Sequence, residues 1–89
     1  KVPHMGWNKV FFKQDHDLFA NIETDTRFYF VHSYLLKDFD EEKSFSTTHH
    51  GIEFVSSIGD ENIFATQFHP EKSGQAGLRF FDNFLKWNP

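Results

Sequence analysis

The feature that most constrains this chain is a long apolar run at residues 27–36 (RFYFVHSYLL). A strand with one face in water alternates apolar and polar residues, and this run does not alternate. The run is therefore expected to form a central strand that is covered on both faces. Because the chain offers only one long amphipathic helix, at its end, the pattern predicts half of an α/β domain rather than a complete one.

Short, mostly antiparallel strands are expected around that run. Their predicted positions are residues 8–13, 45–50, 52–58 and 62–69. Gly51 and residues 57–60 are expected to form the turns of an antiparallel meander. Residues 1–8, which contain a proline and a glycine, are expected to be a loop. Asp17 is expected to cap one helical turn, and residues 38–43 to form an acidic, solvated turn.

The end of the chain is expected to be an amphipathic helix that is capped by Ser73. Polar residues recur there with helical spacing, at Arg79, Asp82, Asn83 and Lys86. The remaining positions form a wide apolar arc that is expected to be buried, namely Leu78, Phe80, Phe81, Phe84, Leu85 and Trp87.

Composition excludes several classes of protein. The chain has 89 residues, enough for one domain at most, and 9 basic against 13 acidic residues, which argues against binding to nucleic acid. No apolar stretch approaches the roughly 18 residues that would cross a membrane. The chain has no cysteine, and therefore no disulfide, thiolate metal site or cysteine nucleophile of its own. Its 13 phenylalanines predict that a half-domain exposes large apolar areas and associates with its other half or with itself.

The candidate chemistry lies at residues 67–73 (QFHPEKS). Residues two apart in an extended backbone project to the same face, so His69 and Glu71 are expected to lie side by side. A carboxylate beside an imidazole accepts the Nδ1 proton and leaves Nε2 free as a base. Such a pair is the base and orienter of a nucleophilic triad. By spacing alone, however, a His-x-Glu pair is more often a surface salt bridge.

Three motifs along the chain resemble class I (triad-type) glutamine amidotransferases. They are residues 68–73 (FHPEKS), residues 2–8 (VPHMGWN) and residues 28–34 (FYFVHSY). With residues 77–78 and 83–85, they are most similar to the branch of glutaminase subunits that serve imidazole glycerol phosphate synthase in histidine biosynthesis. The motifs cover the chain in the family's order. The resemblance implies the C-terminal half of a flavodoxin-like amidotransferase domain.

The resemblance also implies an activity and the residues that perform it. The reaction is hydrolysis of the side-chain amide of L-glutamine through a glutamyl thioester, without a cofactor, in the cytoplasm. His69 would be the general base for a cysteine, Glu71 would orient it, and Ser33 and Tyr34 would help hold glutamine. The residues that would meet the partner, a cyclase with a (β/α)8 barrel, are Met5, Gly6, Trp7 and Lys72. By its loop position alone, Trp7 fits either the core or such an interface.

The 89 residues depart from the family in what they lack. They contain neither the glycine-flanked cysteine elbow nor the glycine-rich oxyanion loop, and no Gly-x-Ser-x-Gly replaces the elbow. The isolated chain is therefore expected to be inactive. Two alternatives stay open. The same chemistry could feed ammonia to another synthase, such as one for surface sugars, or the chain could be a non-catalytic binding or assembly module.

Six histidines raise the question of a metal site. Residues 49–50 and Glu53 offer ligand types, but they lack the H-E-x-x-H order and a helix to present it, so no metal site is expected. In the family, a tyrosine often precedes the glycine that corresponds to Gly51, whereas this chain has His50 there. His32 is expected to be a buried neutral imidazole bonded to backbone, and His4 and His16 are expected at the surface or in loops.

Overall fold

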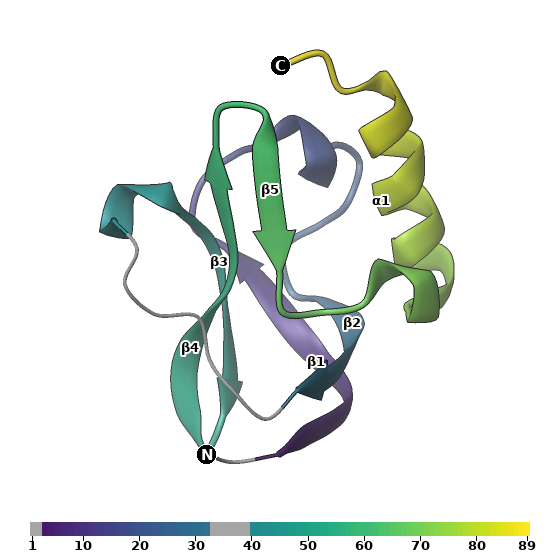
Figure 1. Ribbon diagram of the computed structural model, residues 1–89. Helices are drawn as coiled ribbons and strands as arrows, with labels where there is room; N and C mark the ends of the chain where they lie inside the picture. The colour runs from purple at the N-terminus through teal and green to yellow at the C-terminus, as the bar shows by residue number, and fades with distance from the viewer. Residues whose placement is uncertain (1–2, 33–39) are drawn as a thin grey trace.

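The computed structural model describes residues 3–32 and 40–89. It shows an antiparallel sheet with a helix at one side (Figure 1). Its elements are β1 (His4–Phe12), η1 (Asp17–Phe19), β2 (Thr26–His32), η2 (Glu41–Lys43), β3 (Ser44–His50), β4 (Ile52–Asp60), β5 (Ile63–Thr66), η3 (Pro70–Lys72) and α1 (Gly74–Lys86), where η denotes a 3-10 helix. In these residues the five strands lie in the order β2-β1-β3-β4-β5, and all neighbours are antiparallel. This arrangement confirms the expected antiparallel strands and final helix.

Two strands begin or end where the sequence predicted loops. β1 starts at His4, because its first residues pair with β2 from His4↔His32 onwards, so the predicted loop is wrong for residues 4–8. β4 continues through Asp60, and the turn follows it at residues 61–62. Gly59 is needed for packing and not for a turn, since a Cβ there would lie 2.9 Å from a ring carbon of Phe45.

The apolar run at residues 27–36 is not a central strand in the described residues. β2 lies at the edge of the sheet and pairs with β1 on one side only. Phe28 and Phe30 are fully buried on one face, whereas Tyr29 on the other face is only half-buried. The free edge of β2 is met by a bridge from Phe30 to Phe68. The apolar character of the run therefore serves one buried face and an aromatic contact, rather than two covered faces.

Aromatic rings form most of the core. Phe28 packs against Phe68 with ring centroids 4.4 Å apart, and Phe80 of α1 meets both rings edge-on. Among the described residues, the buried hydrophobic side chains are Val10, Leu18, Phe19, Phe28, Phe30, Phe54, Phe68 and Phe80. The core thus joins β1, β2 and the segment after β5 to the inner side of α1.

The turn at η1 is capped differently from the prediction. Asp17 begins the turn, but its cap is His16, whose Nδ1 accepts a hydrogen bond from the Leu18 backbone at 3.0 Å. His16 is therefore partly buried, and burial lowers the pKa of its imidazole while the nearby Asp17 opposes that shift. At the other predicted turn, residues 40–42 are exposed as expected, and Asp38 lies outside the described residues.

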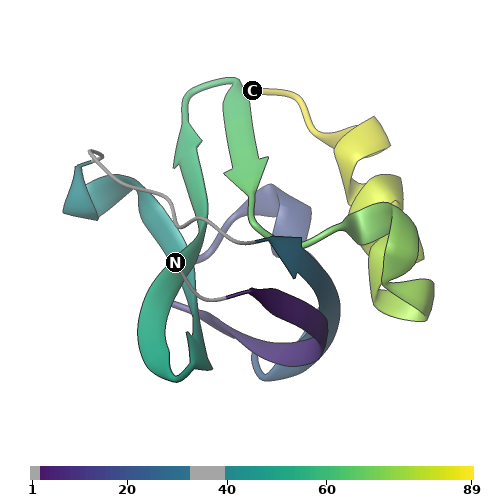
Figure 2. The ribbon, with the colours of Figure 1, turned by 60° about the horizontal axis from the view of Figure 1, so that its bottom comes forward.

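Only one side of α1 is buried, so the prediction of a wholly buried apolar arc is wrong. The helix stands at one side of the sheet in both views (Figures 1 and 2). Its buried residues are Gly77, Phe80 and Asn83, spaced three apart, whereas Leu78 and Leu85 are 70% and 82% exposed. In the described ranges, no helix has the length and apolarity needed to cross a membrane.

Asn83 joins α1 to η1 and is expected to matter for stability. Its Nδ2 donates to the carbonyl oxygens of Leu18 at 2.9 Å and Ala20 at 2.7 Å. Asn83→Ala would leave these carbonyls without that donor and is expected to lower the free energy of unfolding by about 2 kcal/mol in urea titrations. Asp82→Ala removes only an exposed ion pair with Lys86 and is expected to cost less than about 0.5 kcal/mol. Equal losses for both variants would contradict this account.

Candidate active site

The backbone places His69 where strand gives way to helix. After β5 the chain runs beside β2, where Phe68 bridges Phe30 and the His69 N–H donates to Tyr29 O at 2.8 Å. Pro70 then begins η3. Its fixed φ suits the first position of a helix, and because proline has no N–H, no backbone donor is left unpaired there. The base candidate therefore stands at the last extended position of this segment.

His69 and Glu71 are in contact, as expected. His69 Nδ1 lies 2.9 Å from Glu71 Oε2, and the two side chains are 38% and 55% exposed. The backbone that brings the two side chains together is, however, not the extended one that was expected. His69 has extended backbone, whereas Glu71 lies in the first turn of η3, so the turn brings the carboxylate back to the ring.

The hydrogen bond between the two side chains favours the ionised form of the Glu71 carboxylate. The hydrogen bond with His69 is the main cause that lowers the pKa of Glu71, and the backbone N–H of Glu71 adds to it. An ionised Glu71 accepts the Nδ1–H of the imidazole, which leaves the Nε2 lone pair available. The pair can therefore take a proton at Nε2 and hold the resulting cation. To act as part of a cysteine-based triad, the pair of His69 and Glu71 would need a nucleophile from elsewhere, because the 89 residues contain no cysteine.

The residues predicted to meet a partner lie on β1 and η3. Met5 and Trp7 are 76% and 53% exposed, so Trp7 is not a core residue, and it stands on a strand rather than a loop. The Trp7 ring packs edge-on against Tyr29 at 5.8 Å, and a Cβ on Gly74 would lie 3.6 Å from it. Trp7 therefore lies beside the start of α1. The exposed Lys72 precedes that start by two residues.

Two predicted substrate residues cannot be placed. Ser33 and Tyr34 lie outside the described residues, so their roles remain predictions.

The sequence did not predict a histidine cluster that forms at the start of β1. His4, expected at the surface, is buried, stacks on His50 with centroids 4.0 Å apart, and has its Nδ1 3.1 Å from His32 Nε2. His32 is half-buried rather than buried, and its contacts include the side chain of Gln67. His4 is brought into this cluster by the pairing of β1 with β2 and β3. The residue pattern of the sequence did not reveal that pairing. Within the described ranges, no three such side chains converge as metal ligands.

The cluster predicts sensitivity to acid. Burial, followed by the nearby His50 and His32, lowers the pKa of His4 to about 4, whereas the unfolded chain titrates near 6.5. Between these values the unfolded state binds more protons, so the free energy of unfolding should fall as pH drops from about 6.5 to 4, by up to about 3 kcal/mol. His4→Gln is expected to flatten this dependence in urea titrations, whereas the exposed His49→Gln should leave it unchanged. An unchanged slope in His4→Gln would contradict the assignment.

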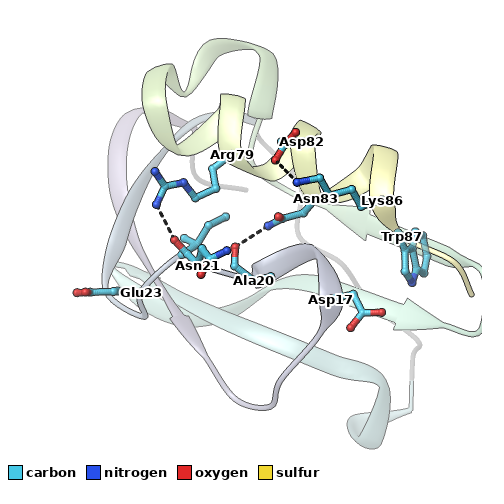
Figure 3. A pocket seen from close by; sticks show the side chains of 10 residues that line it. Asp17, Ala20, Asn21, Glu23, Arg79, Asp82, Asn83, Lys86 and Trp87 are labelled. Carbon is cyan, nitrogen blue, oxygen red and sulfur yellow. Dashed lines mark hydrogen bonds and ion pairs between the residues drawn. The ribbon is translucent and has the colours of Figure 1, made fainter.

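Two hollows of the described part of the structure lie away from His69. The first, of about 740 Å³, separates α1 from η1 and the residues after it (Figure 3). Arg79 Nη1 donates to Asn21 O there at 2.8 Å, and Lys86 pairs with Asp82, so both cationic side chains of this hollow already have partners. A second hollow, of about 390 Å³, lies between β5 and the exposed rings of α1. Neither hollow is lined by the candidate dyad.

Comparison with known proteins gives one family and a consistent set of relatives. The family model for glutamine amidotransferase class-I matches residues 1–87. Three similar proteins are named imidazole glycerol phosphate synthase subunit HisH. The one from Hydrogenovibrio crunogenus is 52% identical over 88 residues, which make up 99% of this chain and 41% of the relative. Those from Nitrosomonas europaea and Acinetobacter baylyi are 49% and 48% identical, covering 100% and 99% of this chain and 42% and 43% of the relatives. The chain therefore spans about two fifths of the length of the curated relatives it matches.

Proposed function

The chain belongs to the class I glutamine amidotransferase family, and from that premise we propose that it supplies the histidine and the glutamate of a Cys-His-Glu triad in a glutaminase. The glutaminase would provide ammonia to imidazole glycerol phosphate synthase in histidine biosynthesis, in the cytoplasm. The names of the similar proteins support this assignment. The observation that carries the proposal is the 2.9 Å contact between His69 Nδ1 and Glu71 Oε2 at the end of the extended segment.

The proposed reaction uses His69 as base and then as acid. Nε2 takes the proton of a cysteine thiol, and the thiolate attacks the side-chain carbonyl carbon of L-glutamine. The imidazolium then gives that proton to the leaving nitrogen, so ammonia departs and a glutamyl thioester remains. Water, deprotonated by the same Nε2, hydrolyses the thioester to glutamate and returns the thiol. Glu71 stays ionised throughout and stabilises the imidazolium.

The nucleophile must come from outside these 89 residues, because they contain no cysteine. We propose that it belongs to an N-terminal half of the domain, together with the oxyanion loop, and that the chain alone is inactive. The greater length of the similar proteins supports this. In this proposal Ser33 and Tyr34 help hold the glutamine. The exposed apolar arc of α1 would be covered by that other half, and the isolated chain would self-associate.

The partner surface in this proposal is Met5, Gly6, Trp7 and Lys72, which would contact a cyclase with a (β/α)8 barrel. The exposure of Met5 and Trp7 supports it, since methionine and tryptophan are enriched at protein interfaces. Ammonia would then pass to the cyclase instead of into solvent. No nucleic acid or membrane takes part in the proposed function.

The experiment that tests the function is reconstitution. The full-length chain that contains these residues is mixed with the cyclase, and glutamate release from L-glutamine is measured together with transfer of ammonia to the cyclase product. Both are expected. Glutamate release with no transfer to this cyclase would favour another acceptor, such as a surface-sugar synthase. A full-length chain without a Gly-x-Cys-x-Gly elbow, and without glutamate release, would instead indicate a non-catalytic module.

Trp7→Ala is expected to weaken binding of the cyclase by about 2 kcal/mol, or roughly 30-fold in Kd, because buried tryptophans dominate interface energetics. Calorimetric titration of the two proteins measures this. Ile63→Ala is the matched control, since Ile63 is also exposed, at 67%, but lies on β5. An unchanged Kd in Trp7→Ala would remove Trp7 from the partner surface.

A further inference from the structure

We propose that Ser73 is a positioning residue whose hydroxyl ties the backbone of His69 to β2 and thereby fixes where the imidazole stands. The consequence for catalysis rests on the proposed function. The link itself, however, is a property of these residues and can be tested without any activity.

The link takes the place of a sheet hydrogen bond. The bridge between Phe30 and Phe68 sets Tyr29 opposite His69, a pair that in a regular antiparallel ladder would exchange both backbone hydrogen bonds. One of these is present, from His69 N–H to Tyr29 O at 2.8 Å. In place of the other, Tyr29 N–H donates to Ser73 Oγ at 2.9 Å, and Ser73 Oγ–H donates to His69 O at 2.7 Å. The hydroxyl is therefore inserted into the ladder.

The insertion explains how the chain leaves the sheet at this point. Pro70 turns the backbone away from β2 into η3, which would strand the N–H of Tyr29 at the edge of the sheet. The Ser73 hydroxyl reaches back four residues to bond that N–H and the His69 carbonyl together. His69 O also accepts the Lys72 N–H at 3.0 Å. Both backbone polar groups of His69 are therefore held.

The hydroxyl is diverted from its expected role. Ser73 stands at the N-cap of α1, where a serine side chain ordinarily bonds a helix N–H and contributes about 1 kcal/mol. Here it makes no such bond to the helix, and the residue is only 1% exposed. Its donor and its acceptor are both used by the link between His69 and β2. The Ser73 hydroxyl thus holds the backbone at His69 instead of capping α1.

The anchoring matters because the imidazole is only partly enclosed. More than a third of the His69 side chain is exposed, so neighbouring atoms cover only part of the ring. Its direction depends on the backbone and on the Nδ1 contact with Glu71. A catalytic base displaced by about 1 Å loses on the order of 100-fold in rate. Ser73→Ala is therefore expected to lower kcat by about 10- to 100-fold with little change in KM, since Ser73 would not touch glutamine.

The experiment compares Ser73→Ala with Ser46→Ala in the full-length protein bound to its partner. Ser46 is the matched control, because its hydroxyl is fully buried and bonded to those of Ser56 and Ser57. The readouts are kcat and KM for glutamate release, hydrogen exchange of the Tyr29 amide, and the ¹⁵N signals of the His69 ring. Ser73→Ala is expected to speed Tyr29 exchange about tenfold, shift the His69 signals and lower kcat. Ser46→Ala should alter none of the three.

The outcomes separate this inference from the proposed function. Faster Tyr29 exchange with unchanged kcat and unchanged His69 signals would overturn the positioning role. If the unmodified protein releases no glutamate, the proposed function fails, while Tyr29 exchange and the ring signals still decide the link. If Ser73→Ala does not fold, the unmodified protein provides the test. Its Tyr29 amide must be protected although it lies at the sheet edge, and rapid exchange there would overturn the inference.

Discussion

Replacement of His69 by alanine is expected to reduce the proposed glutamate release by the full-length protein by about 1,000-fold or more. The change removes the group that would take the thiol proton and return it to ammonia, and general acid–base catalysis alone supplies roughly 100- to 10,000-fold. Because His69 is partly exposed and lies outside the aromatic core, the fold should survive the change. Steady-state assays of glutamate release, with circular dichroism as a check on folding, measure the effect.

The control for this prediction is His49→Ala. His49 is an exposed histidine on β3, opposite Glu53, so its removal takes away the same side chain without touching the dyad. The control should keep full activity. Full activity in His69→Ala would show that the role assigned to this residue is wrong, even if the protein proved to be a glutaminase.

Gly77→Ala is expected to lower the free energy of unfolding by about 3 kcal/mol or more, near the upper end for overpacking. A Cβ at this position would overlap the carbonyl oxygen of Pro70, which is backbone and cannot rotate away. That oxygen also accepts the Ser73 N–H at 3.0 Å, so moving it would loosen the turn that carries Glu71. Thermal unfolding should show a Tm lower by at least about 10 °C.

The sign of this effect distinguishes packing from helix propensity. In an unhindered helix interior, exchanging glycine for alanine stabilises by up to about 1 kcal/mol. Gln75→Ala, on an exposed position of the same helix, provides the control and should change stability by less than about 0.5 kcal/mol. A Gly77→Ala variant as stable as the original would mean that α1 does not approach η3 this closely.

Much of the local structure follows from the sequence. The strands of the meander, the turn at Gly51, the final helix and the contact between His69 and Glu71 were all predicted from neighbours a few residues apart. Each depends on alternation, helical spacing or a turn residue, which a short stretch of chain carries within itself. The resemblance to the amidotransferase family likewise rests on short motifs, and the match over residues 1–87 confirms it.

The tertiary structure decided which of these residues are covered and which bonds they make. His4 is buried because pairing with β2 and β3 stacks it on His50, and Leu85 is exposed because only one side of α1 meets the sheet. Ser73 gives up its helix cap because the N–H of Tyr29, 44 residues earlier, lies within reach of its hydroxyl. Burial and bonding of this kind are set by segments distant along the chain, so no local pattern contains them. Sequence alone thus determined most of the elements and the contact between His69 and Glu71, whereas packing decided how firmly that contact is held.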